Sequence, residues 1–247
     1  MEVSRTLARV ERLLLEWFAA NARDLPWRHT RDPYAILVSE VMLQQTQVDR
    51  VVPRYLAWLE RWPTAESLAA ATTGDVIREW QGLGYNRRAL NLHRAARCVA
   101  ASGWPDDLTQ LPGVGRYTAD AVARFAHAAP VLPVDVNVRR VLERTGAEFG
   151  PASAQALMDL GATVCHARTP RCETCPLAHS CPSRGRKYEP LRKQSRFEGS
   201  FRQRRARTLR LVADETRSLD ELDPEIVSAL AADGLVELRA GAVSLPQ

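Results

Sequence analysis

The segment LPGVGRYTADAVARFAHAAPVLPVDVNVRR, from Leu111 to Arg140, predicts a tight turn between two helices. A Gly-x-Gly sequence, Gly113 to Gly115, follows a proline and precedes an apolar-periodic stretch from Thr118 to Phe125. Glycines let the backbone turn sharply, so that N–H groups at the start of the next helix can hold a phosphate oxygen. The pattern indicates either an anion-binding turn or a plain connection between helices.

A lone carboxylate, Asp135, stands twenty residues after this turn, at the predicted start of a helix that Gly146 closes. Aspartate is a common helix N-cap, because its side chain accepts hydrogen bonds from the first backbone N–H groups. Capping is therefore the simplest interpretation of Asp135 from its local sequence.

Apolar residues at helical spacing predict further helices on both sides of this segment. We expect helices over residues 4–20, 34–51, 51–60, 65–71, 74–80, 87–101 and 151–164. Trp58, Trp62 and Trp80 are expected to be core residues.

Glu40 lies in the middle of the predicted helix 34–51, between Val38 and Val41. Desolvation by apolar neighbours would raise the pKa of this carboxyl group, as a general acid near neutral pH requires. From the pattern alone, an exposed glutamate on the polar face of the helix is the simpler interpretation.

The segment GLGYNRRA, from residue 82 to residue 89, places Tyr85 on a turn made by two glycines. A tyrosine in such a position can insert as a wedge into a stack of bases. Arg87 and Arg88 follow at once and are predicted to meet phosphates.

The charge distribution is uneven along the 247 residues, although the formal net charge is only +5. Residues 184–210 contain eleven Lys or Arg against two Glu, whereas residues 211–247 contain eight acidic against two basic residues. The basic segment suits a phosphate backbone or a solvated linker.

Lys187 and Lys193 are the only lysines. Chemistry that needs a lysine amine therefore has no candidate in the first 186 residues.

No stretch approaches the eighteen consecutive apolar residues of a membrane span, and the first residues have an amphipathic pattern that differs from a signal peptide. We therefore expect a cytoplasmic, nucleoid-associated protein without a membrane partner.

Four cysteines, Cys165, Cys172, Cys175 and Cys181, have the spacing C-x6-C-x2-C-x5-C. A disulfide framework is not expected in a protein without a secretory signal. Four thiolates this close in sequence can hold a zinc ion or a [4Fe–4S] cluster, and the spacing alone scarcely separates the two. The fifth, Cys98, lies in an apolar helix and is expected to be a core thiol.

Residues 201–247 predict a basic helix, a second helix that ends near Gly234, and two short apolar stretches around Arg239 and Gly241. This order suits a small winged-helix-like unit, which could bind DNA, brace the core or bind a protein partner.

Together, LPGVG, the segment SEVMLQQTQV at residues 39–48, GLGY and the four cysteines resemble the helix-hairpin-helix DNA glycosylases of the endonuclease III type. The resemblance is greatest to the MutY-type adenine DNA glycosylases and covers residues 20–182. It implies an all-α, two-lobed fold with a six-helix barrel lobe and an iron–sulfur lobe. The implied boundaries are 28–133 for the barrel lobe, 1–27 with 134–182 for the iron–sulfur lobe, 183–200 for a basic linker and 201–247 for the C-terminal unit.

The resemblance also implies roles for particular residues. Glu40 matches the catalytic acid, and Asp135 matches the carboxylate that stabilises the sugar cation. Tyr117 stands where bifunctional relatives have a Schiff-base lysine, which implies a monofunctional enzyme. The implied substrate- and DNA-binding residues are Leu25, Trp27, Arg28, Gln45, Tyr85, Arg87, Gly113, Val114, Gly115 and Gln155. The implied ligands of a [4Fe–4S] cluster are Cys165, Cys172, Cys175 and Cys181.

The sequence therefore predicts a monomeric enzyme that removes adenine mispaired with 8-oxoguanine or guanine from double-stranded DNA. Two departures from the family stand out: Asn86 replaces a second tyrosine, and the C-terminal unit is too short to be the nucleotide-hydrolase-like domain with which many relatives read 8-oxoguanine. A thymine or uracil mismatch glycosylase and a non-catalytic DNA-binding module are the alternatives.

Overall fold

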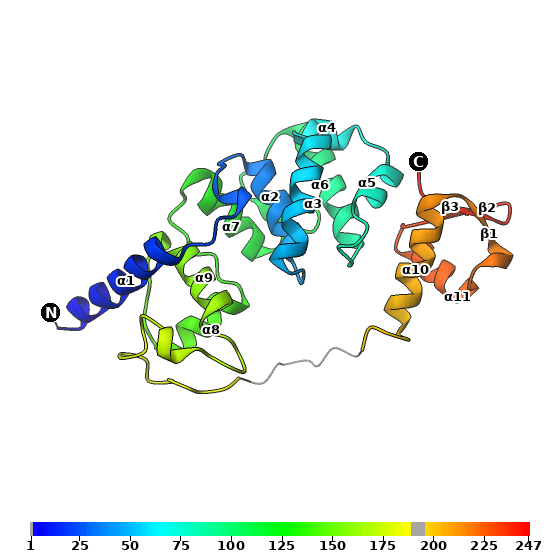
Figure 1. The fold of residues 1–247 in the computed structure, drawn as a ribbon. Helices are drawn as coiled ribbons and strands as arrows, with labels where there is room; N and C mark the ends of the chain where they lie inside the picture. Colours follow the sequence, from blue (N-terminus) through cyan, green and yellow to red (C-terminus); the bar gives the residue numbers. More distant parts are fainter. Residues whose placement is uncertain (1, 189–195) are drawn as a thin grey trace. The chain divides into compact units, whose positions relative to one another are not determined.

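The structure is a computed structural model that describes residues 2–188 and 196–247. It divides into two compact units. Figure 1 shows their helices and strands. The first unit contains Met1–Pro33 and Arg116–Lys193, and the second contains Tyr34–Gly115 and Gln194–Gln247. Lys193 and the centre of the predicted basic linker lie outside the described residues.

The first unit is built around a small core of helices. Its elements are α1 (Glu2–Asn21), η1 (Pro26–Arg28), α7 (Arg116–His127), α8 (Val136–Thr145), η3 (Pro151–Ser153), α9 (Ala154–Thr163) and η4 (Cys172–Thr174). Leu14 of α1, Val141 of α8 and Leu160 of α9 are almost completely buried in one cluster. Cys165 and Cys175 pack against the same cluster, so the apolar core supports the cysteine-containing segment.

The second unit begins with a group of helices whose starts are marked by the sequence. They are α2 (Pro33–Leu43), α3 (Val48–Arg61), α4 (Ala65–Ala69), α5 (Thr73–Glu79), α6 (Arg87–Ser102) and the short η2 (Leu108–Gln110). Thr64 and Thr72 are the N-caps of α4 and α5, because each side chain accepts a backbone N–H of the first turn.

A cluster of aromatic side chains fixes α2 against α3 in this unit. The Trp58 and Trp62 rings meet edge to face at 4.7 Å between centroids, and Trp80 meets Trp58 at 5.5 Å. The Tyr34 hydroxyl donates to the carbonyl of Trp62 and accepts from Nε1 of Trp58. The predicted core position of the three tryptophans is confirmed, since none is more than 6% exposed.

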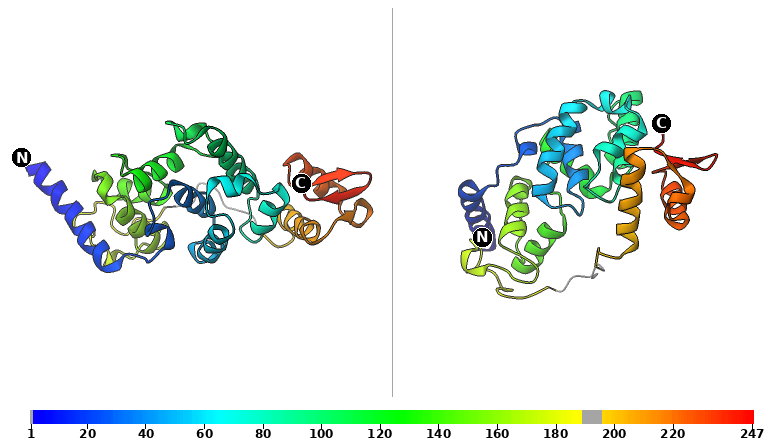
Figure 2. Two further views of the ribbon diagram at one scale, coloured as in Figure 1. Left: turned by 90° about the horizontal axis from the view of Figure 1, so that it is seen from above. Right: turned by 45° about the vertical axis from the view of Figure 1, so that its right-hand side comes forward.

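The C-terminal segment of the second unit contains two helices and a small sheet. Its elements are α10 (Phe201–Asp214), β1 (Arg217–Ser218), η5 (Leu219–Glu221), α11 (Pro224–Ala232), β2 (Glu237–Arg239) and β3 (Ala242–Ser244). The strands pair antiparallel in the order β1–β3–β2, and the sheet lies beside the two helices (Figure 2). Leu209, Ile226 and Val243 form one core cluster with Ile77 of α5 and Leu90 of α6.

Helices dominate the chain, and the predicted all-α fold class is confirmed. The C-terminal order of two helices and a β-hairpin also matches the sequence pattern, whereas the two-residue β1 is too short to have a pattern of its own. Among the described residues, no helix is both long enough and apolar enough to span a membrane.

Two predictions about the helices are wrong. The expected helix 34–51 is divided into α2 and α3, because the chain turns at Gln45, whose φ of 58° lies in the left-handed region. Cys98 is exposed on α6 and is not a core thiol, because its neighbours Ala96 and Val99 take the buried face of the helix.

Candidate functional site

Glu40 is a buried carboxyl group within the second unit. All nine residues from Tyr34 to Met42 are buried, which is expected for a helix that is apolar on every side. Glu40 is only 6% exposed, so the interpretation of this residue as a solvent-facing glutamate is wrong. A buried carboxyl group therefore lies in the middle of α2.

The carboxyl end of α2 leads into a loop whose backbone is held by Arg88. The last carbonyl groups of a helix lack partners within the helix, and a cation that donates to them is stabilising. Nη1 of Arg88 donates to the carbonyl oxygens of Val41, Met42 and Gln44 at 2.8, 2.9 and 2.6 Å. Burial lowers the pKa of Arg88 to about 10, which leaves the guanidinium charged at neutral pH.

The same guanidinium also holds the glycine turn of residues 82–85. Nη2 of Arg88 donates to the carbonyl oxygens of Leu83 and Gly84 at 3.2 and 3.0 Å, and Nε donates to that of Tyr85 at 3.4 Å. The prediction that Arg88 meets phosphates is therefore wrong, because its charge is buried and hydrogen-bonded within the protein.

Two predicted DNA-contacting residues extend from these loops. Gln45 is exposed, and Tyr85 keeps 46% of its surface exposed. Both have left-handed backbones, with φ of 58° and 47°, which is uncommon for residues other than glycine. Arg87 is also largely exposed, and its guanidinium lies 3.7 Å from the carboxylate of Asp233.

The turn LPGVG has a steric reason for its first glycine. Gly113 has φ of 77°, and a Cβ at this position would lie 2.6 Å from Cβ of Asn91. Val114 is buried, whereas Gly115 has open space where a side chain would lie. Helix α7 begins directly after Gly115, and Tyr117 is half-buried in its first turn.

Asp135, in the first unit, is the N-cap of α8. Its Oδ1 accepts from the backbone N–H groups of Asn137 and Val138 at 2.9 and 2.7 Å, and its Oδ2 accepts from Nδ2 of Asn137 at 3.0 Å. Asn137 Oδ1 in turn accepts from Nη2 of Arg140, whose Nε donates to the carbonyl of Cys165 at 2.6 Å. The capping interpretation is confirmed, and a continuous hydrogen-bonded chain joins the Asp135 carboxylate to the cysteine-containing segment.

The predicted base-pocket residues Leu25, Trp27 and Arg28 lie on a turn that a buried carboxylate anchors. Arg28 donates through Nη1 and Nη2 to the two oxygens of Asp159, at 2.9 and 2.7 Å. Nε and the backbone N–H of Arg23 donate to the same carboxylate. Leu25 is buried and Trp27 is half-buried, so the Arg28 guanidinium positions this turn on α9.

The carboxylate of Asp159 has no exposed surface, and its charge is balanced by two arginines. Burial alone would raise the pKa of Asp159, but the hydrogen bonds from Arg28 and Arg23 outweigh it and hold the pKa below its ordinary value of 3.8. Gln155, another predicted pocket residue, is half-buried in the first turn of the same helix. Helix α9 therefore carries both Gln155 and the anchor of the turn.

We expect Asp159→Asn to lower the free energy of unfolding by about 3 kcal/mol at pH 7, because it leaves two partly buried guanidinium groups without their anion. Since the folded pKa is depressed, the stabilisation is complete above the ordinary pKa of 3.8 and is lost as pH falls through the folded value. Urea unfolding of wild type and variant between pH 7 and pH 3 measures the difference.

Asp120→Asn is the matched control, because Asp120 pairs with the largely exposed Arg116 on the surface of α7. It should change the free energy of unfolding by less than about 0.5 kcal/mol. Two results would contradict the anchoring role of Asp159. One is a change in the free energy of unfolding for Asp159→Asn as small as that of the control. The other is a difference in stability between wild type and Asp159→Asn that does not decrease as the pH is lowered.

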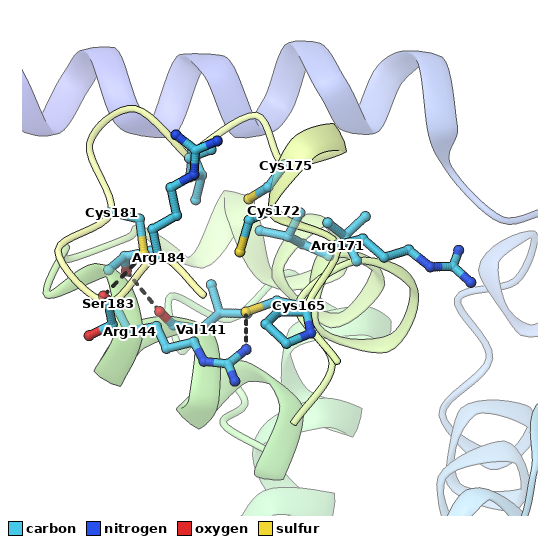
Figure 3. Close-up of a pocket in the computed structure, with 15 residues that line it drawn as sticks. Val141, Arg144, Cys165, Arg171, Cys172, Cys175, Cys181, Ser183 and Arg184 are labelled. Atoms are coloured by element: carbon cyan, nitrogen blue, oxygen red, sulfur yellow. Dashed lines mark hydrogen bonds between the residues drawn. The ribbon is translucent and has the colours of Figure 1, made fainter. Parts of the chain in front are cut away.

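Four cysteines line one pocket in the first unit (Figure 3). Their side chains turn toward a common space, which Val141, Arg144, Leu160 and Leu177 also line. In the part of the chain that the structure describes, no three His, Cys, Asp or Glu side chains form a ready site for a single metal ion. The pocket offers four sulfur donors spread around its wall.

The electrostatics of this pocket fit a negatively charged group with thiolate ligands. Burial raises the pKa of the Cys175 thiol to about 11 and also raises the pKa of Cys181, so these thiols need a bound cation to lose their protons at neutral pH. Arg144 is 2% exposed and donates to Sγ of Cys165 at 3.1 Å. Within the described ranges it has no carboxylate partner, so a thiolate-bound cluster would balance its buried charge.

Two known protein families match this chain, one over most of the helices and one over the cysteine-containing segment. Residues 38–161 match the HhH-GPD superfamily of base excision DNA repair proteins. The chain belongs to this family. Residues 165–181 match the iron–sulfur binding domain of endonuclease III, and the cofactor of the chain is a [4Fe–4S] cluster. The matched segment contains all four cysteines from Cys165 to Cys181.

Similar proteins with curated names are adenine DNA glycosylases. That of Mycolicibacterium smegmatis is 42% identical, with 92% of each chain covered. That of Mycobacterium tuberculosis is 45% identical over 79% of this chain and 76% of the relative. The human adenine DNA glycosylase is 38% identical over 76% of this chain and 42% of the human protein.

Solved structures of glycosylases share the fold. A thermostable thymine-DNA glycosylase has a TM-score of 0.67 at 26% identity, covering 74% of this chain and 98% of that one. A trapped endonuclease III–DNA covalent intermediate has a TM-score of 0.63 at 22% identity, covering 72% of this chain and 95% of that one. The second likeness concerns the fold alone.

Three residues organise these regions: Asp159 and Arg144, which no sequence pattern singled out, and Arg88, whose predicted role was wrong. Each is a buried charge, at 0%, 2% and 9% exposure. A signal exists for Asp159, which is the only charged residue in the mostly apolar α9. Arg88 and Arg144 lie in arginine-rich helices, where the sequence does not separate a buried arginine from an exposed one.

Proposed function

We propose that this chain is a monofunctional DNA glycosylase, which hydrolyses the N-glycosidic bond of adenine mispaired with 8-oxoguanine or guanine in double-stranded DNA. The observation that carries the proposal is Glu40, a buried carboxyl group on a helix whose carboxyl end leads directly to the exposed Gln45. The adenine DNA glycosylases with which the chain shares 38–45% identity support the choice of base. Such an enzyme would act inside the cell as a monomer.

The chemistry assigns separate roles to two carboxyl groups. The target base must leave the stack before its glycosidic bond can be reached. Glu40 donates a proton to N7 of adenine, the C1′–N9 bond breaks, and the base leaves with the electron pair. Asp135 balances the positive charge on the sugar or captures it at C1′. The Glu40 carboxylate then takes a proton from water as the water oxygen bonds to C1′.

Recognition of adenine falls to residues of the first unit. The amide of Gln155 can pair in a bidentate manner with an adenine edge. Trp27 offers apolar surface to the flipped base, and the buried Leu25 supports the same turn, which Arg28 fixes to Asp159. The role of Arg28 is therefore to hold the wall of the pocket.

Residues of the second unit engage the duplex. Tyr85 inserts beside the extruded nucleotide, and Gln45 enters on the side of the opposite base. Arg87 contacts a phosphate as an exposed cation, and the backbone of residues 113–115 binds another. In this proposal residues 28–133 form the barrel lobe, and residues 1–27 with 134–182 form the cluster lobe.

The cluster ligands in this proposal are Cys165, Cys172, Cys175 and Cys181. When bound, the cluster joins the segments around the pocket by metal–sulfur bonds.

We expect Cys175→Ala to remove most of the absorbance near ~400 nm that Cys-ligated iron–sulfur centres show, together with the iron content. Cys98→Ala should leave both unchanged, because Cys98 lies on the exposed face of α6. Zinc as the only metal in purified protein would contradict the assignment.

Tyr117 replaces the lysine that a bifunctional enzyme would use, and residues 1–186 contain no lysine. Strand cleavage by β-elimination through a lysine Schiff base is therefore not expected. Borohydride treatment during turnover should trap no covalent protein–DNA adduct, and a trapped adduct of the wild-type protein would overturn the monofunctional assignment.

The proposed function is tested by single-turnover base release from four matched duplexes. These carry A opposite 8-oxoguanine, A opposite G, T opposite G and U opposite G, with alkaline strand scission as the readout. The proposal requires fast release of adenine only. The likeness to a thymine-DNA glycosylase makes thymine or uracil removal the second candidate, and cleavage at T or U would favour it. Release from none of the four would favour a non-catalytic DNA-binding module.

A further inference from the structure

We propose that Arg88 is a positioning residue, which fixes Gln45 and Tyr85 as one rigid unit for insertion into the duplex. This inference rests on the proposed function, because it takes these two side chains as the ones that enter DNA. It assigns the buried guanidinium a role that its position in an arginine-rich segment does not predict.

Six backbone carbonyl groups accept hydrogen bonds from the Arg88 guanidinium. Arg88 donates to the carbonyl oxygens of Val41, Met42 and Gln44 on one side, and these precede Gln45 directly. It donates to the carbonyl oxygens of Leu83, Gly84 and Tyr85 on the other side. Two loops that lie about forty residues apart in the sequence therefore share one hydrogen-bond donor group.

A second contact reinforces the connection between the loops. The hydroxyl of Thr46 accepts from Nη2 of Arg88 at 3.0 Å and lies 3.4 Å from the carbonyl oxygen of Leu83, to which it donates. The guanidinium carbon of Arg88 also lies 5.6 Å from the centre of the Tyr85 ring and 5.2 Å from that of Trp80. The same cation therefore contacts both the backbone and the ring of the proposed wedge.

The left-handed backbone of Gln45 and Tyr85 explains why these residues need contacts from another side chain to keep their conformation. Gln45 and Tyr85 have φ of 58° and 47°, a conformation that side chains with a Cβ disfavour. Such residues keep this conformation when surrounding contacts determine it. Arginine suits the task, because its planar guanidinium presents five donors in a fixed geometry, whereas lysine has three donors on one flexible nitrogen.

The first turns of α6 also support the glycine turn of residues 111–115. Asn91 follows Arg88 by three residues, and its side chain occupies the space that a Cβ on Gly113 would need. The three loops proposed to meet DNA are therefore all supported by one helix, and Arg88 is the residue that contacts two of them.

The test is a double-mutant cycle measured by single-turnover base release at saturating enzyme. We expect Arg88→Lys to slow release by about 10- to 100-fold, since small misplacements of inserting groups cost this much. In a Gln45→Ala, Tyr85→Ala background, the same Arg88→Lys change should cost less than about twofold, because the groups that Arg88 positions are gone. A general loss of structure would reduce the rate by the same factor in both backgrounds.

Two further variants make the outcome decisive. Arg94→Lys, on the exposed face of the same helix, should leave the rate unchanged. Thr46→Val removes one acceptor of Arg88 and should slow base release by several-fold in the wild-type background only. This variant tests the inference if Arg88→Lys does not fold. The inference is overturned if Arg88→Lys or Thr46→Val releases base at the wild-type rate, or if the loss of rate is equal in both backgrounds. In each case, adenine release by the wild-type protein still supports the proposed function.

Discussion

Replacing Glu40 by glutamine should slow single-turnover release of adenine by about 10³- to 10⁴-fold, the range that general acid–base catalysis contributes. Glutamine has the shape of glutamate but cannot donate a proton to N7 of the base or accept one from water. Because the two side chains have the same shape and volume, we expect the substitution to leave the packing of the buried α2 intact. The expected loss is therefore chemical and does not come from unfolding.

Ser39→Ala provides the control for Glu40→Gln. Ser39 is the adjacent buried polar residue, and its hydroxyl donates to the carbonyl of Ile36 at 2.8 Å within the same helix. Its loss should cost about 1 kcal/mol of stability and leave the rate of base release unchanged. Base release by Glu40→Gln at the wild-type rate would remove the assignment of the acid, and binding to the mismatched duplex without any release by wild type would favour the non-catalytic alternative.

The sequence predicts local structure well where one pattern determines it. Helical spacing located most of the helices, and Asp135 was identifiable as an N-cap from its position alone. The exception is the helix expected over residues 34–51, because a left-handed residue leaves no mark in an apolar-periodic pattern. Gln45 breaks that helix, and it is also the residue proposed to enter the duplex.

Buried charges were harder to predict than helices, since their partners are distant in the sequence. Asp159 binds arginines more than 130 residues earlier, and Arg88 donates to carbonyl groups more than 40 residues earlier. No local pattern encodes such a pair. The motifs therefore indicated which loops carry the candidate site, and the fold was needed to identify the charged side chains that hold those loops.

Substitutions of Asp135 can separate the two roles proposed for its carboxylate, which are capping of α8 and stabilisation of the sugar cation. Its Oδ1 caps α8, a role that asparagine fills equally well, but an amide nitrogen in place of Oδ2 cannot accept the hydrogen bond from Asn137, so Asp135→Asn should lower the free energy of unfolding by no more than about 1 kcal/mol. Asparagine lacks the negative charge that would balance the sugar cation, and base release should fall by about 10²- to 10³-fold. Asp135→Ala loses the cap as well and should be about 1 kcal/mol less stable. Single-turnover rates and urea unfolding of both variants separate these effects.

The chain contains its own control for this experiment in α11. Asp223 is the N-cap of that helix and accepts from the backbone N–H groups of the second and third helical residues, as Asp135 does in α8. Asp223→Asn therefore changes the same kind of cap and should leave base release unchanged, although it also removes an exposed ion pair with Arg204 that contributes at most about 1 kcal/mol. If Asp135→Asn also released adenine at the wild-type rate, the carboxylate would be a cap alone, and the charge that stabilises the sugar would have to come from another residue. A loss of activity in Asp135→Asn alone, with the stabilities of the two asparagine variants within about 1 kcal/mol of each other, would assign the negative charge of Asp135 to catalysis and its Oδ1 to helix capping.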